Sequence, residues 1–251
     1  MSTIRYTATK LKAINKDGIL KPDSDGYYTL VIGGLNTLNS AGEYYTLQGA
    51  KDLFDKSSIF QRRVSGGNLK SELGHPKMQP GMSNDAFLSR ILRIEETNVC
   101  AHISEVWLDE AYGKNNPRLN NPQLVAIMGK VKPSGPKGEV LKEALENSKE
   151  NVCFSIRALT KDYYLKGINH RVLLNIVSWD YVTEPGISVA NKWDSPALES
   201  ISDMYVSERS ISNIVNSKEL VAMESDKAVA IETLALFKQP IANKAPAISK
   251  W

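Results

Sequence analysis

The sequence predicts a β-rich α+β domain, followed by a C-terminal segment of different character. Within residues 26–182, short runs rich in Val, Ile and Tyr recur between turn residues, which is typical of strands. Residues 139–150 instead have the spacing of an amphipathic helix. From residue 191 onward, Ser, Glu, Ala and Lys dominate. We therefore expect one domain over residues 1–190 and a separate helical or flexible segment over residues 191–251.

Strand-like composition is found in several separate segments, each bounded by Gly, Asn, Pro or charged residues. These are residues 26–35, 86–94, 99–108, 123–131, 151–159 and 170–182. Residues 86–94 and 99–108 flank the short segment EETN, so we expect the two to pair as a hairpin.

Two segments are predicted to be helical, and a long loop lies between the first of them and the next strand. Residues 49–60 and 139–150 carry apolar side chains at helical spacing. Residues 64–87 are dense in Gly, Pro, Ser and Asn. Loops of this length are uncommon inside a compact domain and are often functional.

The composition excludes several classes of protein. An apolar share of 42% in 251 residues is too high for a disordered chain and sufficient for a core. No apolar run is long enough to span a membrane, and residues 1–18 lack the apolar centre of a signal peptide. A formal charge of +3 does not favour specific nucleic-acid binding. Cys100 and Cys153 are expected to be buried thiols of a cytoplasmic protein.

The three histidines are the natural candidates for a general base near neutral pH. His75 lies in the Gly/Pro-rich loop, where Pro76 stiffens the backbone that presents the imidazole. An exposed loop histidine without a chemical role is nevertheless the commoner explanation of such a pattern. His102 shares a strand face with Cys100, but two ligands alone do not predict a metal site. His170 begins a strand.

Ser155 and Arg157 lie two residues apart in a predicted strand, so their side chains are expected on the same face. A hydroxyl beside a guanidinium is a place where developing charge can be stabilised. By pattern alone, a Ser/Arg pair that faces solvent on an edge strand is the favoured explanation of the segment.

Taken in order, three segments resemble those of the prohead maturation proteases of large tailed phages. The segment Ser71–Pro76, SELGHP, resembles the histidine box of that family, and Cys153–Ala158, CFSIRA, resembles its serine box. Asp180, in SWDYVTEPG, matches a downstream acidic residue. The resemblance covers about residues 26–190. It implies the fold of herpesvirus assemblin, an antiparallel β-barrel surrounded by helices.

The resemblance also implies roles for individual residues. Ser155 is the expected nucleophile, because Ile156 replaces the second serine of the family's box. His75, which precedes Ser155 by 80 residues, is the expected general base. Arg157 is the candidate for shaping the oxyanion hole. No cofactor and no metal are expected.

The third catalytic residue is open at this point. Asp180 follows Ser155 by 25 residues and matches the family's acidic position. Assemblins use a second histidine in this role, so His102 and His170 are alternatives to Asp180.

Substrates and location follow from the same resemblance. The resemblance implies cleavage after glutamate. It also implies action on scaffold, internal and major capsid proteins inside the prohead, in the host cytoplasm. A substrate glutamate needs a cationic pocket, for which the candidates are Arg62, Arg63 and Lys77. The candidate self-cleavage sites lie in the C-terminal segment, after Glu224 (preferred), Glu199, Glu219 or Glu232. A homodimer or higher oligomer is compatible with the activation of assemblins by dimerisation. The alternatives are a catalytically inactive scaffold or core protein of the same fold and a nucleic-acid-binding internal protein.

Overall fold

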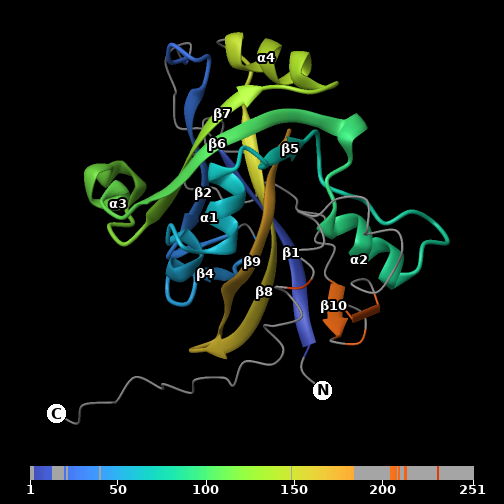
Figure 1. Cartoon of the computed structure of the whole chain (residues 1–251). Coiled ribbons are helices and arrows are strands. Elements are labelled where there is room, and N and C mark those ends of the chain that lie inside the picture. The colour runs from blue at the N-terminus through green and yellow to red at the C-terminus, as the bar shows by residue number, and fades with distance from the viewer. Residues whose placement is uncertain are drawn as a thin grey trace.

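The computed structural model describes residues 3–12, 20, 22–39, 41–147, 149–183 and 204–207, together with residues 209, 212–213 and 231. Strands are the main elements of this part of the chain (Figure 1). The strands are β1 (Thr3–Lys12), β2 (Tyr28–Leu35), β3 (Thr37–Leu38), β4 (Tyr44–Thr46), β5 (Lys70–Glu72), β6 (Val99–Asp109), β7 (Val125–Pro133), β8 (Cys153–Leu165), β9 (Ile168–Val182) and β10 (Met204–Ser207). The helices are η1 (Lys51–Phe54), α1 (Ile59–Ser65), α2 (Asn84–Leu92), η2 (Glu96–Asn98), α3 (Tyr112–Asn115), η3 (Pro117–Leu119) and α4 (Gly138–Glu146), where η denotes a 3-10 helix.

The strands form two sheets. One has the order β10-β1-β8-β9-β4-β3 and the other the order β2-β7-β6-β5. The pairing is antiparallel except between β4 and β9. The β-rich α+β class expected from the sequence is confirmed. The expected closed barrel is not found: among the described strands, neither sheet pairs its first strand with its last.

The core lies where the two sheets and α1 meet. β2 contacts β8, and β5 contacts β9. Trp179 of β9 is fully buried, with its ring 5.8 Å from that of Phe60 on α1. Phe154 and Ile156 of β8 belong to the same apolar cluster. Because side chains alternate along a strand, this placement assigns the intervening residues of β8 to the opposite face.

Most of the predicted elements are present. The strands expected at 26–35, 99–108, 123–131, 151–159 and 170–182 are β2, β6, β7, β8 and β9, and the helix expected at 139–150 is α4. Five strands escaped prediction, namely β1, β3, β4, β5 and β10. The longest of them is β1, whose lysines and threonines mask the alternation of its apolar residues. β1 pairs with β8, on the side of β8 opposite to β9.

The strand predicted at residues 86–94 is wrong, because this segment forms helix α2. The Ser83 hydroxyl caps the helix by accepting a hydrogen bond from the Ala86 N–H at 3.2 Å. The buried side chains have the spacing of a helical stripe and are Phe87, Leu88, Ile91 and Leu92. A short apolar run does not distinguish helix from strand by itself. The expected hairpin is therefore absent, and β6 pairs with β5 and β7.

Two other boundaries also differ from expectation. The helix predicted over residues 49–60 is divided into η1 and α1, and Ser58 caps the second of these. The long loop predicted over residues 64–87 contains β5, which pairs with β6. The loop is therefore anchored to a sheet on its N-terminal side.

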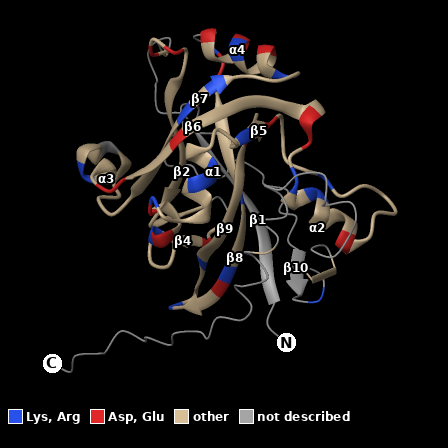
Figure 2. Ribbon diagram, in the orientation of Figure 1, with Lys and Arg blue, Asp and Glu red and all other residues tan. Residues whose placement is uncertain are grey.

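Charged residues of both signs are interspersed over the described elements (Figure 2). The chain as a whole is nearly balanced, with 31 basic and 28 acidic residues. Within the described ranges, no helix is both long and apolar enough to cross a membrane.

Candidate active site

One face of the β8–β9 hairpin carries four polar side chains that are withdrawn from solvent. Ser155 is the direct cross-strand partner of Asp180, and Arg157 is the partner of Ser178. Directly opposed residues of an antiparallel pair project to the same face. All four are fully buried, with 0% exposure. The paired strands β8 and β9 thus form the platform of the site.

His75 is held over this platform by backbone contacts. Leu73 forms an isolated bridge with Tyr181 of β9, and the Gly74 N–H donates to the Tyr181 carbonyl at 2.6 Å. Gly74 has a φ of 77°, in the left-handed region that glycine enters without a steric penalty. The turn at Gly74 therefore directs the chain so that the next residue, His75, faces Asp180.

The His75 ring joins Asp180 to Ser155. Nδ1 lies 2.8 Å from Asp180 Oδ2, and Nε2 is hydrogen-bonded to the Ser155 hydroxyl oxygen. An ionised carboxylate only accepts hydrogen bonds, so it selects the tautomer with the proton on Nδ1. Nε2 is then left with a lone pair directed at the serine hydroxyl. A nucleophile, a base and a group that orients the base are therefore linked in series by hydrogen bonds, and we call Ser155, His75 and Asp180 the catalytic line.

Asp180 is ionised at neutral pH. Burial by itself raises the pKa of this carboxyl, but the charge of Arg157 and the hydrogen bond with His75 together outweigh burial, so the pKa lies below its usual value. An anionic Asp180 can orient the His75 ring and stabilise an imidazolium.

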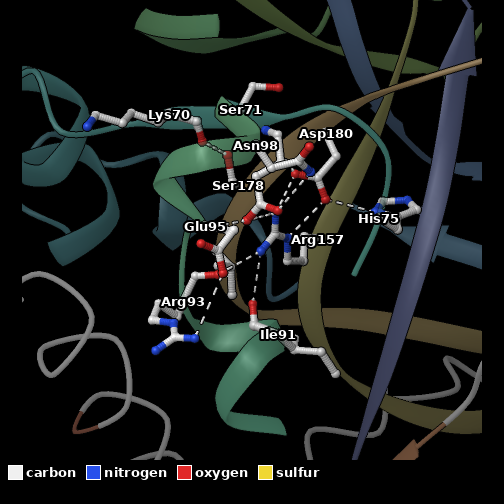
Figure 3. Close-up of polar contacts among 12 residues, drawn as sticks. Lys70, Ser71, His75, Ile91, Arg93, Glu95, Asn98, Arg157, Ser178 and Asp180 are labelled. Carbon is white, nitrogen blue, oxygen red and sulfur yellow. Dashed lines mark hydrogen bonds and ion pairs between the residues drawn. The ribbon is translucent and has the colours of Figure 1, made fainter. Parts of the chain in front are cut away.

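Arg157 binds Asp180 through two parallel contacts, from Nε to Oδ2 at 2.9 Å and from Nη2 to Oδ1 at 2.5 Å. Its Nη1 donates to the carbonyls of Ile91 at 3.3 Å and Arg93 at 3.0 Å, and Nη2 also lies 3.0 Å from Glu72 Oε1. In Figure 3, Arg157 lies between Asp180 and the chain at Ile91 and Arg93, and His75 lies beyond Asp180. These acceptors match the five N–H groups of a guanidinium. An Arg157 N–H that donated to a substrate oxyanion would have to give up one of these five acceptors.

Sequence reasoning missed Glu72, whose carboxylate is fully buried behind Arg157. Besides its contact with Arg157, it forms a bidentate ion pair with Arg90. It also accepts a hydrogen bond from the Glu95 N–H at 2.9 Å and lies 3.4 Å from Asn98 Nδ2. Its position within the histidine box was visible in the sequence. A single Glu in a polar loop nevertheless resembles an ordinary solvated residue.

The structure does not bring the other two histidines to His75. His102 Nδ1 lies 2.9 Å from the Tyr27 hydroxyl, and its Nε2 lies 3.0 Å from the Gly67 carbonyl oxygen. His170 stacks on Tyr163, with ring centroids 5.0 Å apart, near the end of the β8–β9 hairpin. Of the three candidates for the third position, Asp180 is the one that touches His75.

Both cysteines are free and buried, as expected. Burial raises the pKa of Cys100 to about 12, so its thiol stays protonated. The Cys100 sulfur lies 3.5 Å from the Ser71 carbonyl. Among the described residues, no group of three or more His, Cys, Asp or Glu side chains is arranged to hold a metal ion.

The remaining candidates are placed as follows. Arg63 donates to the carbonyls of Ile176 at 3.2 Å and Val177 at 2.9 Å, so it braces β9. Arg62 and Lys77 are exposed. The candidate self-cleavage sites Glu199, Glu219, Glu224 and Glu232 lie outside the described residues.

The chain is similar to proteins of two phages. The chain is 38% identical over 201 residues to a protein of Pseudomonas phage phiKZ named capsid maturation protease. The aligned region covers 78% of this chain and 72% of the phage protein. Among solved structures, it matches the bacteriophage T4 capsid assembly protease with a TM-score of 0.49 and 12% identity, over 72% of this chain and 99% of that chain. The model of the peptidase S80 family matches residues 6–234. The chain therefore belongs to the peptidase S80 family.

Proposed function

We propose that this protein is a serine endopeptidase of phage capsid maturation, with Ser155 as nucleophile, His75 as general base and acid, and Asp180 as the residue that orients His75. The observation that carries the proposal is the hydrogen-bonded line from Ser155 through both nitrogens of His75 to Asp180. Membership of a peptidase family and the name of the phiKZ relative support it.

The chemistry follows from the positions of these three side chains. His75 Nε2 takes the proton of Ser155 as Oγ bonds to the scissile carbonyl carbon. The resulting imidazolium returns the proton to the leaving amine as the C–N bond breaks, which leaves an acyl-enzyme. His75 then takes a proton from water, the hydroxide attacks the ester, and the proton returns to Ser155. Asp180 stays ionised throughout and stabilises each imidazolium.

In this mechanism Arg157 acts on Asp180. Its two parallel contacts fix the plane of the carboxylate and favour its ionised form. The expectation that Arg157 shapes the oxyanion hole stays a prediction, and its present contacts favour the supporting role. Ser155 is fully buried, so a substrate has to displace neighbouring atoms to reach Oγ.

The finer specificity is proposed on the resemblance. We propose cleavage after glutamate, of scaffold, internal and major capsid proteins within the prohead in the host cytoplasm, by a homodimer or higher oligomer. The exposed cations Arg62 and Lys77 suit the substrate glutamate better than Arg63, which is engaged with β9. Self-processing is proposed within residues 191–251, with cleavage after Glu224 preferred. The intact hydrogen-bonded line speaks against an inactive scaffold protein.

Labelling with a fluorophosphonate probe and a peptide assay test the proposal together. Wild-type protein is expected to carry the probe on Ser155 and to cleave a peptide that contains residues 220–228 after its Glu224. The Ser155→Ala variant is expected to do neither. Cleavage that persists in Ser155→Ala would show that the nucleophile is misassigned. Intact masses of the two proteins test self-processing, which predicts a shorter C-terminus in the wild type alone.

A further inference from the structure

Behind the catalytic line lies a buried chain of four alternating charges. Asp180 pairs with Arg157, Arg157 with Glu72, and Glu72 with Arg90. Asp180, Arg157 and Glu72 have side chains with 0% exposure, and Arg90 is 19% exposed. This series of charges starts at Asp180, which touches His75, and ends at the partly exposed Arg90 on helix α2.

The position of Glu72 matters because Arg157 has opposing effects on the site. Its guanidinium orients Asp180, but its positive charge also offsets the negative charge with which Asp180 stabilises an imidazolium. Nη2 of Arg157 is shared between Asp180 at 2.5 Å and Glu72 at 3.0 Å. A second carboxylate on the same guanidinium compensates its charge, and such compensation is strong where water is excluded.

Glu72 also acts on Asp180 through its own backbone. Its N–H donates to Asp180 Oδ1 at 3.3 Å. Its carboxylate in turn ties η2 to β5, through the Glu95 N–H and Asn98 Nδ2. The side chain and the backbone of Glu72 therefore both contribute to the position of Asp180.

We propose that Glu72 is a positioning residue of the site, which shares Arg157 with Asp180 and so preserves the negative charge that Asp180 presents to His75. Arg90, which is partly exposed, is the outer counter-charge that offsets the negative charge of Glu72. The catalytic consequence rests on the proposed function. The electrostatic coupling between Glu72 and His75 does not.

The sign of the effect depends on the charged groups around His75. Ion pairs link His75 in series to Asp180 on β9, Arg157 on β8, Glu72 on β5 and Arg90 on α2. Lys10 of β1 stands opposite Ser155 in the sheet register and is the same in every variant. Removing the charge of Glu72 disfavours the imidazolium, and removing the charge of Arg90 favours it. Removing both restores the net charge and is expected to cancel most of the shift.

The test uses the full-length chain carrying Ser155→Ala, so that no turnover or self-processing occurs. The His75 imidazole is titrated by NMR, with its signal assigned by comparison with His75→Gln. The variants are Glu72→Gln, Arg90→Gln and the double variant. Glu96→Gln is the matched control, because Glu96 pairs with Lys70 at 2.9 Å in a surface ion pair on the adjoining segment. The signal of His102, which is held by Tyr27, reports whether each variant is folded.

We expect Glu72→Gln to lower the midpoint of the His75 titration by roughly one pH unit, the order of magnitude that Coulomb's law gives for the loss of one nearby charge. Arg90→Gln should raise it, and the double variant and Glu96→Gln should stay near the parent. In the Ser155-containing enzyme, the acidic limb of kcat/KM should move in the same directions. A purely structural role of Glu72 would lower kcat without moving this limb.

The proposal is overturned if Glu72→Gln and Glu96→Gln titrate alike. If Glu72→Gln does not fold, Arg90→Gln decides, and an unchanged midpoint in that variant overturns the proposal. The proposed function fails separately, if wild-type protein and Ser155→Ala cleave the peptide equally. In that case shifted His75 midpoints would still support the coupling.

Discussion

Ser155 and Asp180 are direct cross-strand partners in the β8–β9 hairpin, and both are hydrogen-bonded to His75. Two members of the catalytic line are therefore placed by the register of one strand pair. His75 is placed by the bridge between Leu73 and Tyr181 on the same hairpin. A register shift of one residue would send Ser155 or Asp180 to the opposite face and abolish the site.

Asp180→Asn is expected to reduce kcat by about 10⁴-fold, the loss that the same change causes in the Ser-His-Asp proteases. The amide can donate to Nδ1 and so favour the wrong tautomer of His75. Steady-state kinetics with the peptide of residues 220–228 measure the effect, and circular dichroism checks that the variant is folded. Activity close to that of the wild type would remove Asp180 from the mechanism.

Arg157→Met is expected to destabilise the fold by about 3–5 kcal/mol, because it leaves two buried carboxylates without their shared counter-charge. Urea denaturation measures the free energy of unfolding. Arg93→Met is the matched control: its side chain is half-exposed and lies 4.0 Å from Glu95. A surface pair of this kind contributes less than about 1 kcal/mol. Equal effects of the two substitutions would contradict the buried network.

Asp180 also makes the stability of the protein depend on pH in acid. Its pKa is lower in the folded chain than the usual value of 3.8, so its contribution is complete above that value and is lost as the pH falls through the folded-state pKa. The stability difference between wild type and Asp180→Asn should therefore shrink as the pH falls below about 4. Denaturation series at several pH values below about 5 test this, and a difference that keeps growing as the pH falls below about 4 would reverse the sign.

Gly74→Ala is expected to cost about 1–2 kcal/mol, because the φ of 77° is unfavourable for any residue with a Cβ atom. An added Cβ would meet no atom within 4 Å, so the cost comes from the backbone alone. We also expect a lower kcat, since relaxation of the turn would move His75. Thermal denaturation and kinetics report the two effects. Gly81→Ala is the control, because Gly81 has a φ of 82° and equally open surroundings, but lies six residues beyond His75.

The thiols of Cys100 and Cys153 are expected to resist alkylation by iodoacetamide in the folded protein. Both are buried, and the Cys100 pKa of about 12 leaves almost no thiolate near neutral pH. Mass spectrometry should show both modified rapidly in guanidinium chloride and neither in buffer. Fast labelling of Cys100 under native conditions would show that the chain opens next to Ser71.

Local pattern alone determined a large part of this protein. Alternation placed β8 and put Ser155 and Arg157 on one face, because the two-residue period of a strand depends on nothing outside the strand. The ordered boxes identified His75 and the family. The same local reasoning failed at residues 86–94, where a short apolar run is compatible with a strand or a helix until the Ser83 cap and the packing of α2 decide.

Tertiary structure decided the rest, since it depends on contacts between distant segments. The sequence favoured Asp180 as the third residue and left His102 and His170 as alternatives. Only the docking of the loop that carries His75 on β9 brings Asp180 to His75. The sequence placed Arg157 on a strand face but indicated no partner for it. In the structure, Glu72 and Asp180 both pair with its guanidinium. The types and order of the residues indicated which side chains could do the chemistry. Folding decided which of them share a proton or a charge, because hydrogen bonds and ion pairs depend on distances that no local pattern contains.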